Sequence, residues 1–177
     1  QSDLAMALNE CGNQVSTELG NDSPASLVVV FASATYSDSV SDVPRILRDH
    51  FPAAMILGCS GAGIIGAAKE IQQQSAVALT VGYLPGVEVK PFRVIDNELP
   101  SPDEPPDAWA NLLGVTPEEK PHFLVLMDPF SMAGDGILSG LDYAFPSAVK
   151  VGGLASGSGL PGGHALFLNN QTYNDGA

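Results

Sequence analysis

The sequence predicts an α/β fold with a mixed sheet, built from two duplicated halves with helices on the faces of the sheet. Three observations predict this fold. Short apolar runs have the length of strands, amphipathic segments lie between them, and the whole pattern returns after a proline-rich connector. At 177 residues and 45% apolar content, the chain can bury one sizeable core. We therefore expect one domain made of two pseudo-repeats, at about residues 26–95 and 121–177.

The first predicted element is a packing helix at the start of the chain. Its apolar stripe consists of Leu4, Leu8, Cys11, Val15 and Leu19. Ser2 or Asp3 can serve as the N-cap, and Gly20 can end the helix. Because Gly12 weakens the middle of this helix, tertiary contacts must stabilise it.

The first half reads as strand, helix, strand, glycine loop and hairpin. Residues 26–32 form an apolar, β-branched run that predicts a buried strand, and Pro44 suits the first turn of the helix that follows. A second buried strand at residues 53–58 leads into the glycine-rich stretch 58–63. Residues 76–94 alternate around Leu84-Pro85-Gly86, which predicts an antiparallel hairpin.

The second half repeats this order after the connector of residues 96–121, in which we expect one short helix at 107–113. A strand is predicted at residues 122–127, and a helix carries Ile137, Leu138, Leu141 and Phe145. Phe51 recurs as Phe145 and Gly58 recurs as Gly152, both 94 positions later. This shared offset predicts that the two halves arose by duplication.

The end of the chain lacks one predicted element. The second hairpin turns at Asn169-Asn170 or at residues 174–176, and no return strand is evident after it. An unpaired edge strand exposes backbone groups. We therefore expect that the polypeptide continues into a C-terminal domain beyond Ala177, or that another protein chain completes the edge of the sheet.

Composition excludes several classes of function. Seven basic and 20 acidic residues give a formal charge of −13, which disfavours nucleic acid and anionic membrane surfaces. The two cysteines cannot build a disulfide framework, which fits a reducing, intracellular compartment. No apolar run reaches the roughly 20 residues of a transmembrane helix, so we expect a soluble protein.

Cofactor and metal sites are not expected. Residues 61–66 fit the dinucleotide pattern G-x-G-x-x-G, but the acidic residue that should end the next strand is missing there. No G-K-[ST] follows either glycine loop, so a phosphate-binding P-loop is excluded. The histidines and cysteines lie far apart and show no metal-ligand spacing.

Polar and glycine residues follow the predicted parallel strands, where open α/β sheets bind ligands. Asp128 follows the strand of the second half, at the place that Ser33 occupies in the first half. The candidate ligand-binding residues are Ser33, Cys59, Ser60, Gly61, Asp128, Ser131, Gly153, Ser156 and Gly157. The aspartate and the serines can equally cap the following helices. Cys59 is either a nucleophile or a small buried apolar side chain, and we favour the second interpretation.

Four segments resemble the N-terminal domain of FIST proteins, named after F-box and intracellular signal transduction proteins: FASATYSD, MILGCSGAGII, FLVLMDPFS and VGGLASG. The resemblance covers nearly the whole chain. It implies a non-catalytic sensory domain that binds small ligands such as amino acids, followed by a C-terminal FIST domain. The connector LPSPDEPPDAW is similar to that of cyanobacterial-type members, which implies the cytoplasm or a plastid stroma.

The sequence is consistent with three functions. The first is a small-ligand sensor, favoured by the paired glycine loops and the scarcity of catalytic groups. The second is an accessory or scaffold subunit that docks in a larger complex. The third is an enzyme that uses Cys59, for which no histidine is an evident base.

Overall fold

The computed structural model describes residues 3–20 and 24–177, which form a mixed α/β fold. The main sheet has the strand order β5-β1-β2-β8-β9. Its strands are β1 (Leu27–Ser33), β2 (Met55–Gly61), β5 (Val77–Gly82), β8 (Leu166–Leu168) and β9 (Gln171–Tyr173). β1 and β2 are parallel, whereas β5 pairs antiparallel with β1 and β8 pairs antiparallel with β2.

Two further strand pairs accompany the main sheet. β3 (Gly63–Gly66) and β4 (Lys69–Gln72) form an antiparallel hairpin, and β6 (Phe123–Met127) and β7 (Lys150–Leu154) form a parallel pair. The helices are α1 (Leu4–Leu19), α2 (Val43–His50), α3 (Pro106–Leu113) and α4 (Gly134–Ala144). Short 3₁₀ turns are η1 (Ala34–Tyr36), η2 (Val40–Asp42), η3 (Asp96–Glu98) and η4 (Pro117–Glu119).

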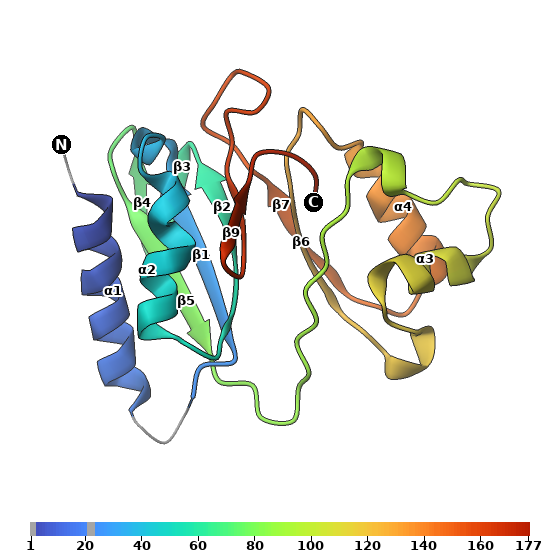
Figure 1. The fold of residues 1–177 in the computed structure, drawn as a ribbon, viewed down its shortest axis with the longest axis horizontal. Helices are drawn as coiled ribbons and strands as arrows, with labels where there is room; N and C mark the ends of the chain where they lie inside the picture. Colours follow the sequence, from blue (N-terminus) through green and yellow to red (C-terminus); the bar gives the residue numbers. More distant parts are fainter. Residues whose placement is uncertain (1–2, 21–23) are drawn as a thin grey trace.

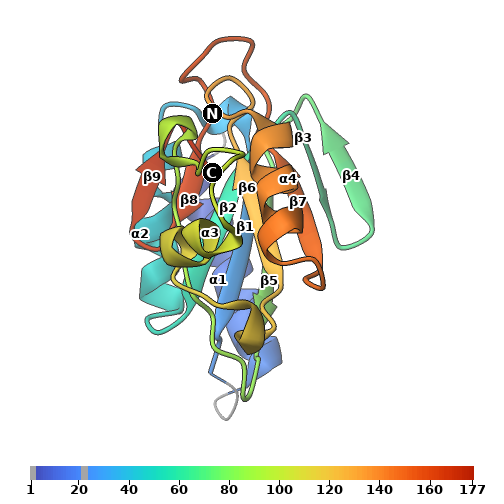
Figure 2. The ribbon, with the colours of Figure 1, turned by 90° about the vertical axis from the view of Figure 1, so that its right-hand side faces the viewer.

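These elements stack in four layers. α1 and α2 cover one face of the main sheet, the β6–β7 pair lies against its other face, and α3 and α4 cover the outer side of that pair (Figures 1 and 2). The predicted helices on the faces of a mixed sheet are therefore confirmed.

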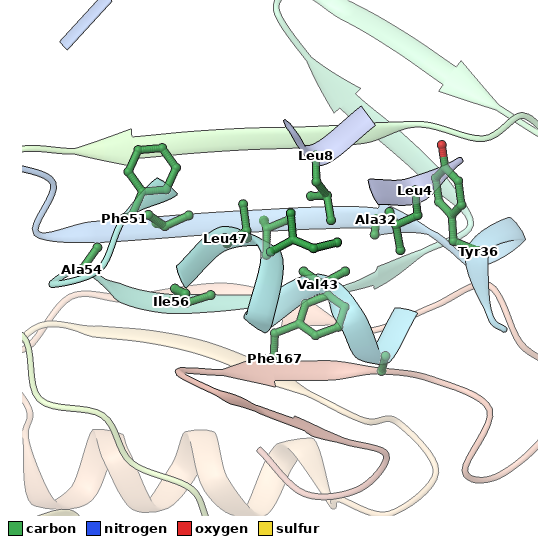
Figure 3. Close-up of a cluster of buried hydrophobic side chains, with 14 residues drawn as sticks. Leu4, Leu8, Ala32, Tyr36, Val43, Leu47, Phe51, Ala54, Ile56 and Phe167 are labelled. Carbon is green, nitrogen blue, oxygen red and sulfur yellow. The ribbon is translucent and has the colours of Figure 1, made fainter. Parts of the chain in front are cut away.

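Each interface between layers has its own core. Leu8 of α1 and Leu47 of α2 pack with Phe167 of β8 on the helical side of the main sheet (Figure 3). Trp109, Ile137 and other apolar side chains fill the space between α3, α4 and β6. A smaller cluster joins the main sheet to the β6–β7 pair, and it contains Cys59, Leu126, Ala155 and Leu166.

The first helix begins and ends where the sequence predicts. The side chain of Asp3 accepts hydrogen bonds from the backbone N–H groups of Ala5 and Met6, and Gly20 follows the last turn. Ser2, the other candidate N-cap, lies outside the described residues.

Glycine is required at the middle of both parallel pairs. A Cβ atom at Gly58 would lie 2.0 Å from the carbonyl oxygen of Val30, and one at Gly152 would lie 1.7 Å from that of Val125. The strand register pairs these same residues, Val30 with Gly58 and Val125 with Gly152. This correspondence supports the proposal that the two halves are duplicated.

The predicted hairpin at residues 76–94 is wrong. The turn at Pro85-Gly86 exists, but residues 87–95 form no strand. They cross to the second half, where Val94 and Ala177 exchange backbone hydrogen bonds. Pro91 offers no N–H to a sheet, which disfavours a strand in this run. The hairpin of the first half is β3–β4 instead.

The prediction that the second hairpin lacks a return strand is wrong. The chain turns at Asn169-Asn170, and the return strand that appeared to be missing is the short strand β9, paired with β8. Among the described residues, several strands lie at an edge of their sheet, including β5, β9 and β7, and the pairing partner of β7 is β6.

Candidate functional site

The carboxyl ends of the parallel strands β1, β2, β6 and β7 lie at the same end of the molecule, the top in Figure 1. Among the described residues, four polar side chains are buried: Ser33, Ser60, Asp128 and His164. Ser33 and Ser60 lie at the ends of β1 and β2, and Asp128 directly follows β6. His164 precedes the antiparallel strand β8, so all four lie at this end of the molecule. Sequence reasoning predicted three of these four residues.

The two glycine loops contact each other directly. Ser60 Oγ donates to the carbonyl oxygen of Ser156 (3.2 Å) and accepts from the N–H of Ala165 (3.1 Å). In return, Ser156 Oγ accepts from the N–H of Ala62 (3.1 Å). The contact brings together four of the predicted residues, Ser60, Gly61, Ser156 and Gly157. Their side-chain hydroxyl groups are thus already bonded within the protein.

Asp128 is the centre of a buried polar cluster. Its Oδ2 atom accepts from Ser131 Oγ (2.7 Å) and from the N–H of Phe130 (3.2 Å), and Oδ1 lies 2.7 Å from His164 Nδ1. Burial by itself would raise the pKa of Asp128, but the hydrogen bonds from Ser131 and His164 outweigh it and hold this pKa below its usual value. The carboxyl group is therefore ionised at neutral pH.

His164 is the site residue that sequence reasoning missed. Its Nε2 atom lies 3.0 Å from the carbonyl oxygen of Ser158, and its ring stacks on Phe130 with centroids 5.5 Å apart. Both ring nitrogens therefore lie within hydrogen-bonding distance of an oxygen atom. The sequence signal that could have identified His164 is its position, because it is a polar residue directly before the apolar run of residues 165–168.

The geometry of this cluster is structural rather than nucleophilic. Ser131 Oγ donates to Asp128 rather than to His164, so the serine hydroxyl of this cluster is not paired with its histidine. Ser131 Oγ also accepts from the N–H of Gly176 (2.9 Å), and the N–H of Asp128 donates to the carbonyl oxygen of Gly176 (2.9 Å). The cluster thus joins the end of β6, the loop before β8 and the last residues of the chain.

Ser33 and Cys59 lie apart from these contacts. Ser33 Oγ bonds to Thr35 Oγ1 and accepts from the N–H of Ala76. Cys59 is 3% exposed and packs with Leu126, and burial raises the pKa of its thiol to about 12. A thiol with this pKa is protonated at neutral pH and is a poor nucleophile. The structure therefore favours the interpretation of Cys59 as a small buried apolar side chain.

A groove of about 410 Å³ runs along β7 beside α4. It is lined by Val125, Met127, Gly134, Asp135, Leu138, Lys150, Val151, Gly152, Gly153 and Leu154. Gly153 is the one predicted ligand-binding residue in this lining. Lys150 Nζ is already held by Asp142 (2.8 Å) and by the carbonyl oxygen of Phe145 (2.7 Å).

Within residues 3–20 and 24–177, no three His, Cys, Asp or Glu side chains gather in a group that could hold a metal ion. In the same residues, no helix combines the length and the apolar character needed to cross a bilayer.

Comparison with known proteins places this architecture in a family. The family model described as the FIST N domain matches residues 26–177. Two uncharacterized proteins of Mycobacterium tuberculosis, from strains CDC 1551 / Oshkosh and H37Rv, are each 24% identical over 176 residues. These matches cover 98% of this chain but 43% of each relative, so the chain spans less than half of their length. No solved structure matches. The chain therefore belongs to the FIST family, whose domains are associated with sensing in signal transduction and are generally non-catalytic.

Proposed function

We propose that this chain is the small-ligand-binding sensory domain of an intracellular signal transduction protein, with amino acids as the ligand class. The groove along β7 is the observation that carries this proposal. Its volume of about 410 Å³ lies in the range of small-molecule sites. It begins beside Met127 at the carboxyl end of β6, which is where open α/β sheets place their ligands.

The chemistry of the groove suits an amino acid. Met127, Leu138 and Leu154 supply apolar surface for a side chain. Asp135 and Lys150 are the charged residues of the lining, one of each sign. A zwitterionic ligand carries one ammonium group, which complements Asp135, and one carboxylate group, which would take the third N–H of Lys150 Nζ beside its bonds to Asp142 and Phe145.

The other predicted residues take a supporting role in this proposal. Asp128, Ser60 and Ser156 bond within the protein and do not line the groove. They hold the carboxyl ends of β2 and β6 and the loop after β7 in fixed positions. Ligand contact is therefore centred on Gly153 and its neighbours, and the buried polar cluster keeps the groove in shape.

Thermal-shift screening against the standard amino acids tests the proposal. A ligand at high excess should raise the melting temperature by about 5 °C. Asp135→Asn should abolish this shift, because it removes the negative charge that faces the ammonium group. Asp107→Asn is the matched control, since Asp107 occupies the first turn of α3 as Asp135 does that of α4 and lies outside the groove. No shift with any amino acid, or equal loss in both variants, contradicts the proposal.

The second candidate function is an accessory or scaffold subunit in a larger complex. The unpaired edge of β7 favours it, because such an edge can pair with another chain. The proposed partners are a C-terminal FIST domain or another protein chain. Affinity purification at native salt should recover a stoichiometric complex, and recovery of the monomer alone would exclude this function.

The proposed compartment is reducing and intracellular, the cytoplasm or a plastid stroma. Cys11 and Cys59 are both free cysteines, which supports this proposal. Recovery of a labelled copy of the protein from a secreted fraction would contradict it.

A further inference from the structure

The outer edge of β7 carries unpaired backbone groups at defined positions. The N–H of Phe123 donates to the carbonyl oxygen of Val149 (2.8 Å), and the N–H of Ala155 donates to that of Met127 (2.9 Å). Because bonding alternates along a parallel ladder, the odd-numbered residues of β7 face β6. The N–H and C=O groups of Lys150, Gly152 and Leu154 point to the opposite side.

The corresponding N–H and C=O groups of β2 form hydrogen bonds with another strand, β8. The N–H of Asn169 donates to the carbonyl oxygen of Ile56 (2.8 Å), and the N–H of Ser60 donates to that of Ala165 (2.9 Å). The even-numbered residues of β2 thus bind the antiparallel strand β8. Residues 56, 58 and 60 correspond, 94 positions later, to residues 150, 152 and 154. Within residues 3–20 and 24–177, no strand pairs with β7 at the position that matches that of β8 on β2.

The surface around this edge is apolar and lacks the usual protection against strand pairing. Val149, Val151 and Leu154 are each 56% exposed. Lys150 is the charged residue of β7, and its ammonium group is turned toward Asp142. The strand contains no proline. Charges, prolines or a covering element protect most edge strands, so β7 has the properties of a strand acceptor.

We propose that β7 accepts an antiparallel strand, with apolar side chains at alternate positions, from the part of a longer FIST polypeptide that its relatives carry outside the matched segment. Two observations select this source. β8, which fills the equivalent position on β2, comes from a later part of the same chain. More than half of each mycobacterial relative lies outside the match, which covers 43% of its length.

The added strand would change the ligand groove. Gly152 and Leu154 belong both to the open edge and to the lining of the groove. A strand paired with them would add a third side to the groove and would place it at the interface of two parts of the polypeptide, where ligand sites are frequent. This inference rests on the proposed docking role, and strand pairing at β7 requires no ligand.

Hydrogen exchange without ligand tests the pairing, by comparing residues 1–177 with the full polypeptide that its gene encodes. In residues 1–177, the outward amides of Gly152 and Leu154 should exchange faster than those of Val151 and Gly153. In the full polypeptide, the outward amides should slow by about tenfold or more. Equal exchange in both samples, or a natural polypeptide without further residues, overturns the proposal.

A matched pair of variants locates the contact in the full polypeptide. Val151→Lys places a charge beside the open edge and should restore fast exchange at Gly152. Val87→Lys makes the same change at a residue that is 58% exposed and lies in a loop away from β7, and it should leave the protection intact. Light scattering identifies a competing occupant, because a dimer of residues 1–177 that Val151→Lys dissociates would assign the edge to a second copy and overturn the proposal.

Discussion

At the scale of single residues, Asp128 and His164 form a buried polar contact at the carboxyl end of the sheets. Asp128 is fully buried and His164 is 4% exposed, and their contact measures 2.7 Å. Removing either side chain lowers the free energy of unfolding, because the remaining buried partner is left without its hydrogen bond. The pair therefore fixes the loop before β8 relative to the end of β6.

Asp128→Ala should lower the free energy of unfolding by about 3–5 kcal/mol at pH 7, as removal of one partner of a buried pair does. Because the folded-state pKa of Asp128 is lowered, its contribution is complete above the unfolded-state pKa of about 3.9 and is lost as the pH falls through the folded value. Urea unfolding from pH 7 to pH 2 measures this difference. A gap between wild type and variant that stays constant below pH 4 would contradict the assignment.

Cys59 should resist thiol reagents in the folded protein, since it is 3% exposed and its pKa is raised to about 12. With Ellman's reagent at pH 8, the partly buried Cys11 should react first, and Cys59 should react only on unfolding in guanidinium chloride. Cys59→Ser is the control, and it should remove only the reaction that appears on unfolding. Rapid reaction of both thiols in the native protein would revive the interpretation of Cys59 as a nucleophile.

At the scale of elements, the close approach of α3 to α4 depends on one glycine. A Cβ atom at Gly140 would lie 1.8 Å from Trp109 Cζ2, whereas one at Gly136 would meet its nearest atom at 3.7 Å. Gly140→Ala should therefore destabilise the protein by about 1–3 kcal/mol through overpacking. Gly136→Ala in the same helix should be neutral or stabilising by up to about 1 kcal/mol. Thermal unfolding compares the two, and equal effects would show that the α3–α4 contact is not tight.

The elements that sequence predicts best are those with a local cause. α1 follows from its apolar stripe and the Asp3 cap, and β1, β2 and β6 follow from short apolar runs of strand length. The run at residues 87–95 alternates like a strand, yet β5 pairs with β1 instead. Tertiary packing determines which strands pair over long distances in the chain, and local alternation does not reveal it.

The residues of the candidate site could be predicted only where they lie at the end of a recognisable strand. Ser33, Ser60 and Asp128 could be named because each ends a recognisable strand. His164 could not, because its role depends on Asp128 lying 36 positions earlier in the chain. The groove beside Gly153 depends on residues of β7 and α4 lying next to each other, a tertiary arrangement that has no signature in the sequence.

At the scale of the whole molecule, the four layers explain why one face offers a site. α1 and α2 cover the main sheet on one side, and the β6–β7 pair and α4 cover the other (Figure 1). β7 is the outer member of that pair, so the groove and the open edge occur side by side. A ligand in the groove and a strand on β7 would therefore influence each other, as sensing requires.

Two glycines allow a test of the groove with little cost to the fold. A Cβ atom at Gly153 or at Gly159 meets no heavy atom within 4 Å, and neither residue needs a positive φ. Gly153 lines the groove, whereas Gly159 lies in the loop before β8. Gly153→Phe should therefore block ligand binding, and Gly159→Phe should preserve it.

Amide chemical shifts, recorded while the protein is titrated with the amino acid that stabilises it most, test the sensory claim most directly. We predict that the signals of Asp135, Gly152 and Gly153 move and that those of Ser60 and Ser156 do not. Gly153→Phe should abolish the response, and Gly159→Phe should retain it. Shifts confined to the glycine-loop serines, or no shift with any amino acid, would contradict the sensory claim.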